Sequence, residues 1–399
     1  MSTSTVKRPC WLEIDSEAIV HNFRLLASLA GPDAELMAIV KANGYGHGLA
    51  HTARAAVEAG AGWLGVTSIE EGVETRAFCP EPRILAIGSV FPGQGAEVVA
   101  HRITPVVWEH PQLDELEQAA RAADLAPGSL PVHLEIDTGM SRQGVTPERI
   151  EPILARFTAA TPLRLEAVMT HLFAADEADQ RQTGLQLEQL RMALEAVRAA
   201  GLAPVWLSVG SSAALVGGIA PRLAALAADF GLRLLMRPGL ALYGVVPRFD
   251  PPFEGAEPAT YTRARRQLHP VLVWKSRVAG LRTIEKGDVV GYNGTFVACK
   301  PMRVALVAAG YADGVDRHLG NHFAFLVGGQ RAPVIGRVSM DHTMIDVSGI
   351  EGVAPGDEVV LLGCQGKAQI SAQQHADATG TIPWEVFTRI GPRVERTVR

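Results

Sequence analysis

The pattern that most constrains the fold is an alternation of short apolar runs and longer amphipathic stretches between about residues 34 and 244. Eight of the short runs have the length and composition of buried strands. They cover residues 36–41, 63–68, 83–88, 104–108, 132–137, 165–170, 205–209 and 234–237. Helical periodicity fills the intervals, for example over residues 50–59 and 186–199. Because parallel strands need helical crossovers, eight such units close most naturally into a (β/α)8 barrel of the TIM type.

An open doubly wound sheet is the competing arrangement for this pattern. Polar residues suited to chemistry follow several different predicted strands rather than one pair of them. These residues are Lys41, Arg142, His171, Ser211, Ser212 and Arg237. Residues dispersed in this way meet at the carboxyl ends of barrel strands, whereas an open sheet gathers its site at one crevice. We therefore predict an α/β chain whose N-terminal barrel covers residues 15–246.

A different architecture is predicted after the barrel. Residues 247–260 contain four prolines and little apolar pattern, which is typical of a linker. Residues 261–399 then predict a mostly β domain, in which strands alternate with glycine-containing turns. The strands are expected at 271–278, 288–291, 303–308, 323–327, 333–347 and 357–362, with a helix at 372–379. Residues 10–14 precede a helix that begins at Ser16, and on pattern alone they could add a strand to either domain.

Composition is that of an ordinary soluble enzyme. A net charge of -5 over 399 residues gives no reason to expect nucleic acid or an anionic membrane as partner. No apolar run reaches spanning length, and the first ten residues do not resemble an export signal, so we expect a cytoplasmic protein. Four cysteines without paired spacing predict neither a zinc site nor a disulfide framework, and we expect no metal. They are Cys10, Cys79, Cys299 and Cys364.

The string AIVKANGYGHG at residues 38–48 carries most of the functional information. An apolar strand runs directly into Lys41, and three glycines follow, interleaved with Tyr45 and His47. A lysine whose stem is held by a buried strand is placed to lose solvent, which favours its neutral, nucleophilic amine. This suits a Schiff-base lysine. On spacing alone, a surface cation with a buried stem is the alternative.

Two turns rich in small residues follow the seventh and eighth predicted strands. They carry SVGSSAA at residues 208–214 and RPGL at residues 237–240. Barrels commonly bind phosphate at this position, and Ser212 with the backbone of Gly239 and Leu240 would supply suitable donors. Two ordinary helix N-caps are the alternative.

The string at residues 38–48 closely resembles the cofactor-binding lysine motif of alanine racemases. MRPGLALYG at residues 236–244 and GRVSMD at residues 336–341 also resemble that family, and the similarity spans nearly the whole chain. The resemblance implies pyridoxal 5′-phosphate as cofactor and interconversion of L-alanine and D-alanine as the reaction. It also implies a homodimer with active sites shared between subunits, and it places residues 10–14 in the second domain.

The resemblance further implies roles for individual residues. Lys41 would bind the cofactor and serve as one catalytic base, and Tyr292 of the partner subunit would be the second. Arg237 would contact the pyridine nitrogen, and because a guanidinium keeps its proton at pH 7, that nitrogen would stay unprotonated. The weaker electron sink favours racemisation over transamination. The remaining cofactor contacts would come from Tyr45, His171, Ser212, Gly239, Leu240 and Trp384.

Substrate binding is implied for Arg142, Met340, Tyr311 and Asp341, with Arg317, Arg337 and Asp176 near the entrance. The sequence departs from the family pattern at two positions. Glu135 stands where one form of the family has a carbamylated lysine, so we hypothesise that it orients Arg142 without modification. Trp384 stands where the family usually has tyrosine, and since an indole N–H donates but cannot accept, the outline of the pocket can differ.

Three alternatives remain open on the sequence. A serine or broad-specificity racemase is kept open by Trp384 and by Ser208 in the entry region. A non-catalytic pyridoxal-phosphate carrier would be expected to lack the β domain and Tyr292. The third alternative is a decarboxylase relative. Such proteins resemble chains that place a glutamate at the pyridine nitrogen, and Arg237 at that position argues against this alternative. The sequence also leaves open whether the reaction supplies D-alanine for peptidoglycan or degrades it.

Overall fold

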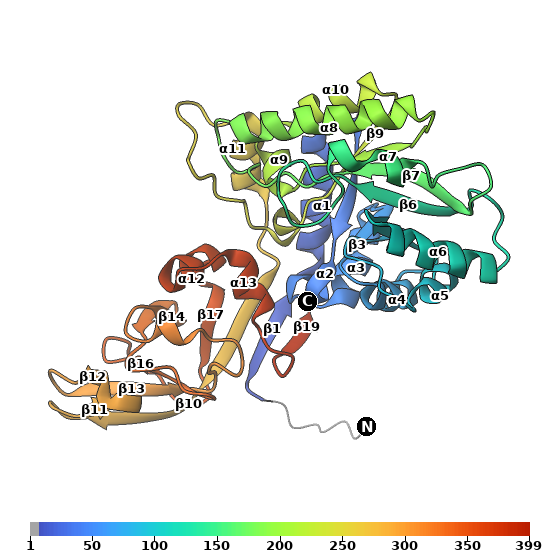
Figure 1. Ribbon diagram of the computed structural model, residues 1–399. Helices are drawn as coiled ribbons and strands as arrows, with labels where there is room; N and C mark the ends of the chain where they lie inside the picture. Colours follow the sequence, from blue (N-terminus) through green and yellow to red (C-terminus); the bar gives the residue numbers. More distant parts are fainter. Residues whose placement is uncertain (1–7) are drawn as a thin grey trace. The chain divides into compact units, whose positions relative to one another are not determined.

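The computed structural model describes residues 8–399, which divide into two compact units (Figure 1). The first unit comprises residues 17–44 and 49–269. The second comprises residues 8–16, 45–48 and 270–399, so a short segment just after Lys41 belongs to it. Residues 247–260, predicted as a linker, lie in the first unit and lead into α11 (Ala259–Gln267).

Eight parallel strands form a closed barrel in the first unit, which confirms the predicted architecture. The strands are β2 (Ala34–Ile39), β3 (Trp63–Val66), β4 (Arg83–Ala86), β5 (Ile103–Val107), β6 (Leu130–Glu135), β7 (Leu163–Met169), β8 (Trp206–Ser208) and β9 (Arg233–Met236). Each is parallel to its neighbours, and β2 pairs with β9 to close the ring, with Leu36 opposite Met236. The polar residues that follow these strands therefore lie at one end of the barrel.

One helix precedes the first barrel strand, and further helices connect the strands to one another. They are α1 (Ser16–Ala30), α3 (Leu49–Glu58), α4 (Ile69–Phe78), α5 (Gly95–Ala100), α6 (His110–Ala122), α7 (Glu151–Leu154), α8 (Arg181–Ala199), α9 (Ser212–Val216) and α10 (Ala220–Asp229). The longest, α8, buries Leu187, Leu190 and Leu194, which lie three and four residues apart on one face. This spacing explains why helical periodicity was detectable in the sequence.

Aromatic and charged side chains close the amino end of the barrel. Arg83 stacks over Trp63 at 4.0 Å from the ring centroid, and Arg233 stacks over Trp206 at 4.2 Å. Each of these four residues begins its strand. The buried Glu166 accepts a hydrogen bond from Arg83. These contacts stabilise the end of the barrel that lies opposite the expected chemistry.

The second unit is built on a mixed sheet around the long strand β10 (Leu272–Ile284), whose own pairings are antiparallel, as predicted for a mostly β domain. Among the described residues, nine strands join this sheet, with β15, β14, β17, β10, β1 and β19 in order and three strands attached to them. The strands besides β10 are β1 (Cys10–Ile14), β13 (Met302–Val307), β14 (Ala324–Val327), β15 (Gln330–Pro333), β16 (Thr343–Asp346), β17 (Glu358–Gln365), β18 (Ala368–Ile370) and β19 (Glu395–Val398). Residues 10–14 pair with β10 and with β19. A separate hairpin joins β11 (Val289–Val290) to β12 (Phe296–Val297).

Two predicted strand boundaries are wrong. The single strand expected at residues 333–347 is mostly a loop at residues 334–342, which lies between the last residue of β15 and the short β16. Gly336 in this loop has φ 70°, and a Cβ there would lie 2.6 Å from the carbonyl oxygen of Val290, so the close backbone approach breaks the extended run. The strand expected at residues 36–41 ends at Ile39, which leaves Lys41 two residues beyond it.

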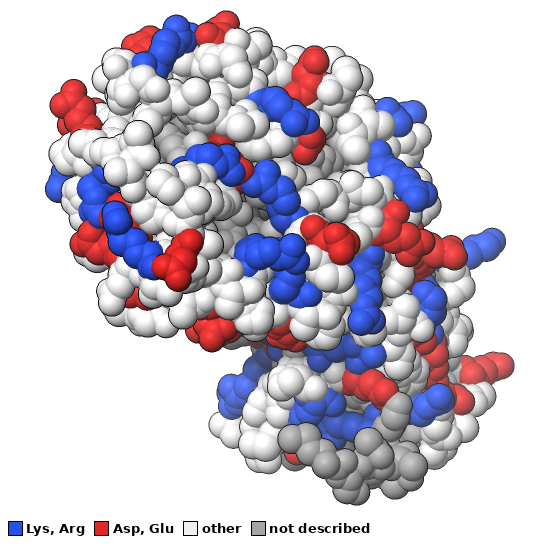
Figure 2. Space-filling view, turned by 90° about the vertical axis from the view of Figure 1, so that its right-hand side faces the viewer, with Lys and Arg blue, Asp and Glu red and all other residues white. Residues whose placement is uncertain are grey.

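No helix within residues 8–399 combines the length and apolarity needed to cross a bilayer. On the face shown in Figure 2, basic and acidic side chains are interspersed. The described part of the chain also lacks a group of three or more His, Cys, Asp or Glu residues suited to holding a metal ion.

A buried histidine makes the second unit sensitive to acid. His375 lies in α12 (Ala372–Thr379), and its Nε2 is 2.7 Å from the carbonyl oxygen of Leu361 on β17. Burial lowers the pKa of His375 from 6.5 to about 4. Because the unfolded chain binds this proton more readily than the folded chain, the contribution to stability is complete above pH 6.5. It is lost as the pH falls toward 4.

We predict that His375→Gln removes this pH dependence while keeping a donor for Leu361. Between pH 7 and pH 5 the unmodified protein should lose about 2 kcal/mol more of its free energy of unfolding than the variant. Urea unfolding at pH 7, 6 and 5 measures this difference. His322→Gln, at an exposed position, is the matched control. An equal loss in the unmodified protein and in His375→Gln would contradict the prediction.

Candidate functional site

The turn that follows Lys41 has an unusual backbone. Lys41 begins the short α2 (Lys41–Tyr45), and the next three residues, Ala42, Asn43 and Gly44, have φ values of 52°, 55° and 60°. A left-handed conformation costs a non-glycine residue about 1–2 kcal/mol, so the surrounding structure must enforce it. The Asn43 side chain accepts a hydrogen bond from the Leu49 N–H at 2.8 Å, and the Gly44 N–H donates to the Val40 carbonyl at 2.8 Å.

Glu71 provides a further support for this turn. One carboxylate oxygen accepts the N–H of Ala42 at 2.7 Å, and the other accepts the N–H of Thr67 at 2.8 Å. Thr67 directly follows β3, so one side chain from α4 connects the ends of two neighbouring strands. Glu71 is not recognisable from the sequence as a functional residue, because a glutamate in the first turn of a helix is common and carries no signal of its own.

Charge and burial act together on Lys41. Burial lowers the pKa of its amine, and the positive charge of Arg142 lowers it further. The Glu71 carboxylate opposes these effects, and Arg237 adds to them. A lowered pKa increases the neutral fraction of the amine, which is the nucleophilic form.

Arg237 lies fully inside the barrel, directly after β9. Its guanidinium donates to the Ser208 hydroxyl at 2.9 Å and to the Thr170 carbonyl at 2.8 Å. Burial lowers the pKa of Arg237 to about 10, although Glu135 raises it, so the group stays protonated at pH 7. Ser208, expected in the entry region, is instead completely buried beneath this arginine.

His171 is neutral in this environment. Burial lowers its pKa to about 3, and the charges of Arg237, Arg142 and Lys41 act in the same direction. Its carbonyl oxygen accepts a hydrogen bond from the side chain of Gln186 on α8 at 3.0 Å. The predicted residues Lys41, His171, Arg142 and Arg237 are thus close enough to influence one another electrostatically.

The two small-residue turns are joined through Ser212. This serine is buried at the start of α9, and its hydroxyl oxygen accepts the N–H of Gly239 at 3.0 Å and that of Ala241 at 3.1 Å. Leu240, between these two residues, begins a 3-10 helix at Leu240–Tyr243. Ser212 therefore joins the two turns at adjacent strand ends, and the predicted phosphate site there stays a prediction.

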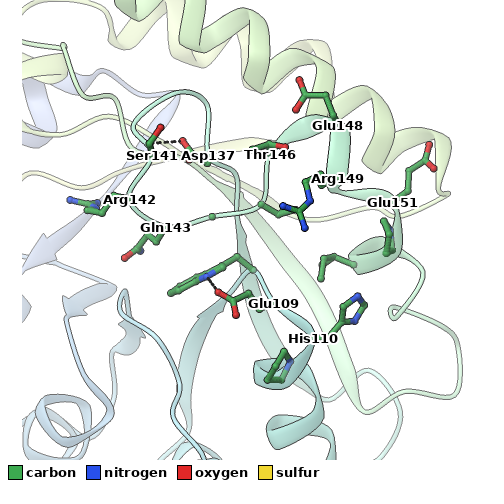
Figure 3. Close-up of a pocket in the computed structure, with 16 residues that line it drawn as sticks. Glu109, His110, Asp137, Ser141, Arg142, Gln143, Thr146, Glu148, Arg149 and Glu151 are labelled. Atoms are coloured by element: carbon green, nitrogen blue, oxygen red, sulfur yellow. Dashed lines mark hydrogen bonds between the residues drawn. The ribbon is translucent and has the colours of Figure 1, made fainter.

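Arg142 lies on the loop after β6. The Asp137 carboxylate shapes this loop by accepting the N–H groups of Gly139 at 2.9 Å and Ser141 at 3.1 Å. Arg142 is exposed and lines an open pocket of about 890 Å³. Figure 3 shows Arg142 at one side of this pocket, with His110 at the other.

Glu135 is buried at the end of β6, on the barrel side where Arg237 lies. Its carboxylate accepts a hydrogen bond from the side chain of Gln143. Burial raises the pKa of Glu135, while Gln143, Arg237 and Arg142 oppose that effect. The direct partner of Glu135 is therefore Gln143, which neighbours Arg142, and its effect on Arg142 is electrostatic.

Apart from Asp176, the remaining predicted residues lie on the second unit, and three of them are exposed. Tyr292 is 65% exposed and begins a short turn (Tyr292–Gly294) between β11 and β12. Tyr311 and Met340 are 44% and 54% exposed. Their loops are connected, because the Tyr311 N–H donates to the Ser339 carbonyl and the Ala312 N–H to the Met340 carbonyl, both at 3.0 Å.

A buried carboxylate fixes these two loops. Asp313 is inaccessible to solvent and accepts hydrogen bonds from Arg8, from Arg393 and from the N–H of Gly310. Arg393 also donates to Asp341 at 2.8 Å. Two arginines thus connect Asp313 to the loop that carries Asp341. The sequence gives no signal of this role, because the contacts join residues that are 52 to 333 positions apart.

Tyr45 and Trp384 come from segments that touch. A Cβ on Gly46 would lie 2.3 Å from the carbonyl oxygen of Phe387, which belongs with Trp384 to α13 (Pro383–Thr388). Tyr45 is buried, which raises the pKa of its hydroxyl, and Trp384 is half-buried. Arg317 begins a turn (Arg317–Leu319), Arg337 lies in the loop at residues 334–342, and Asp176 is exposed in the first unit.

Known proteins match this chain along almost its entire length. The family model "Alanine racemase, N-terminal domain" covers residues 14–247, and "Alanine racemase, C-terminal domain" covers residues 271–398. An alanine racemase of Sorangium cellulosum is 38% identical over 98% of this chain and 99% of its own length.

Solved structures agree with these matches. An alanine racemase from Streptomyces lavendulae has a TM-score of 0.86 at 34% identity and covers 99% of this chain and 98% of its own. A Bartonella henselae alanine racemase with covalently bound pyridoxal phosphate has a TM-score of 0.81 at 26% identity, over 98% and 99% of the two chains. The chain belongs to the alanine racemase family.

Proposed function

We propose that this protein interconverts L-alanine and D-alanine with pyridoxal 5′-phosphate as its cofactor. The observation that carries the proposal is the buried, protonated Arg237 at the same end of the barrel as Lys41, whose amine has a lowered pKa. Family membership and the Bartonella henselae structure with covalently bound pyridoxal phosphate support the choice of cofactor.

The residues present fit this cofactor. Lys41 would bind its aldehyde covalently. Ser212 and the backbone of Leu240 would hold its phosphate, together with the N–H of Gly239 once this group is released from the Ser212 hydroxyl. Arg237 would contact the pyridine nitrogen, with His171, Tyr45 and Trp384 completing the surroundings. When bound, the cofactor stabilises negative charge at the substrate α-carbon. Because Arg237 keeps its proton, it does not transfer that proton to the ring, which limits side reactions.

Racemisation requires proton removal on one face of the α-carbon and proton return on the other. Lys41 serves one face in this proposal, and the partner subunit's Tyr292 serves the other. Tyr292 is 65% exposed on its own chain, which leaves it accessible to a second copy. We infer a homodimer in which each active site contains residues of both chains.

Substrate binding would use the barrel loop that carries Arg142 and the loops of the second unit that carry Tyr311 and Met340. Arg142 would attract the substrate carboxylate, and the backbone of Met340 would donate to it, with Asp341 beside it and Tyr311 at the entrance. The Asp313 contacts would hold the Tyr311 and Met340 loops at a fixed separation. Glu135 would act on Arg142 through Gln143 and through its charge, without carbamylation.

We place this reaction in the cytoplasm. The four cysteines are free, and Cys10 and Cys79 are buried, as is usual for a protein from a reducing compartment.

The shared active site predicts complementation between two inactive variants. Lys41→Ala and Tyr292→Phe should each lose most activity as homodimers, because each site then lacks one base. When the two chains are co-expressed in equal amounts, half of the dimers are mixed and carry one intact site. The activity should then return to about a quarter of the unmodified level.

Rates in both directions, measured by loss of optical activity, test this prediction. If Tyr292 acted within its own chain, every site of a mixed dimer would lack one base and no activity would return. Full activity of Tyr292→Phe alone would remove Tyr292 from the mechanism.

Substrate range is the second point to test, because Trp384 can reshape the pocket. We predict that L-alanine loses optical activity faster than L-serine or L-lysine when each is supplied with the protein and pyridoxal phosphate. Trp384→Tyr should leave this order unchanged. Faster loss with another amino acid would indicate a serine or broad-specificity racemase, and no loss with any of the three despite bound cofactor would indicate a carrier.

A further inference from the structure

We propose that Glu71 is a positioning residue for Lys41, because it holds the left-handed turn that directly follows the lysine. The inference rests on the proposed role of Lys41 in binding the cofactor. None of the hydrogen bonds described above joins the Glu71 side chain to the amine of Lys41 or to another predicted catalytic residue.

The first support is the geometry of the carboxylate. Its two oxygens accept the N–H groups of Ala42 and Thr67 at 2.7 Å and 2.8 Å. Hydrogen bonds to an ionised acceptor are stronger than those between neutral groups. Because Ala42 follows Lys41 directly and Thr67 follows β3, the carboxylate fixes the backbone beside Lys41 to a neighbouring strand of the barrel.

The second support is the conformation that these bonds hold. Ala42, Asn43 and Gly44 are consecutive left-handed residues, and only the glycine adopts this conformation without cost. Asn43 offsets part of the cost through its contact with Leu49. Ala42 has no polar side chain, so its backbone depends on the Glu71 carboxylate for a partner from outside the turn.

The third support is the charge that Glu71 places beside the amine. Burial, Arg142 and Arg237 all lower the pKa of Lys41, and Glu71 acts against them. Loss of the Glu71 charge should therefore lower the pKa of Lys41 further.

A purely structural explanation would treat Glu71 as an acidic residue in the first turn of α4. Glu70 occupies the same turn and allows this explanation to be separated from ours. Its carboxylate accepts a hydrogen bond from Gln94 at 3.0 Å and is hydrogen-bonded to the Ser68 side chain, and neither of these partners belongs to the Lys41 turn. Glu70→Gln and Glu71→Gln thus change helix charge equally, but only the second disturbs the turn.

The test follows formation of the covalent bond between Lys41 and pyridoxal phosphate by absorbance after rapid mixing with cofactor-free protein. A glutamine at position 71 presents one oxygen and one N–H₂ group, so it cannot accept from both Ala42 and Thr67. We expect Glu71→Gln to form the bond roughly tenfold more slowly or worse, since small misplacement of a reacting group is costly. Its rate profile should also move to lower pH. Glu70→Gln should match the unmodified protein in both respects.

Several outcomes distinguish the possibilities. Equal rates and pH profiles for Glu71→Gln and Glu70→Gln would overturn the inference and leave the proposed function intact. Absence of the absorbance change in the unmodified protein, or its presence in Lys41→Ala, would instead contradict the proposed role of Lys41. If Glu71→Gln does not fold, as judged by circular dichroism, Glu71→Asp replaces it. The aspartate side chain is one methylene shorter and its carboxylate cannot reach both N–H groups, so the same slowing is expected, and a rate equal to that of the unmodified protein would overturn the inference.

Discussion

The pairing of β2 with β9 is the constraint on which the candidate site depends. The two strands lie about 200 residues apart in sequence, and their register places Leu36 opposite Met236. Lys41 and Arg237 follow shortly after these paired residues, so closure of the ring brings the two cations to the same end of the barrel. Without closure, the lysine turn and the RPGL turn would lie at opposite edges of an open sheet, and the Ser212 contacts would still join only β8 to β9.

Positive charge dominates the carboxyl end of the barrel. Three cations, Lys41, Arg142 and Arg237, interact there with two carboxylates, those of Glu71 and Glu135. Burial raises the pKa of Glu135. Burial is the main reason why His171 stays neutral and why the Lys41 amine loses its proton more readily, and this excess of positive charge acts in the same direction. It also suits an anionic ligand, because a phosphate or carboxylate would restore charge balance where protein carboxylates are few.

The second unit differs, because the predicted site residues Tyr311 and Met340 are exposed while the backbones of their loops are hydrogen-bonded to each other. Asp313 gathers Arg8, Arg393 and the Gly310 N–H around one buried carboxylate. The cost of burying that charge is offset by several charge-assisted hydrogen bonds. Exposed side chains on a rigid frame are what an active site completed by a second subunit requires, because the frame must be in place before the partner arrives.

The sequence by itself determined the barrel, the β unit and most of the proposed site, because strand and helix periodicities are local and motif residues follow predictable strand ends. Lys41, Arg237 and Ser212 could be selected in this way. Only the tertiary structure decided that Ser208 lies beneath Arg237, that Glu135 contacts Gln143, and that Glu71 and Asp313 support functional loops. Such contacts depend on which distant side chains the fold brings together. The break at Gly336 also arises from a close approach to Val290, which local alternation cannot reveal.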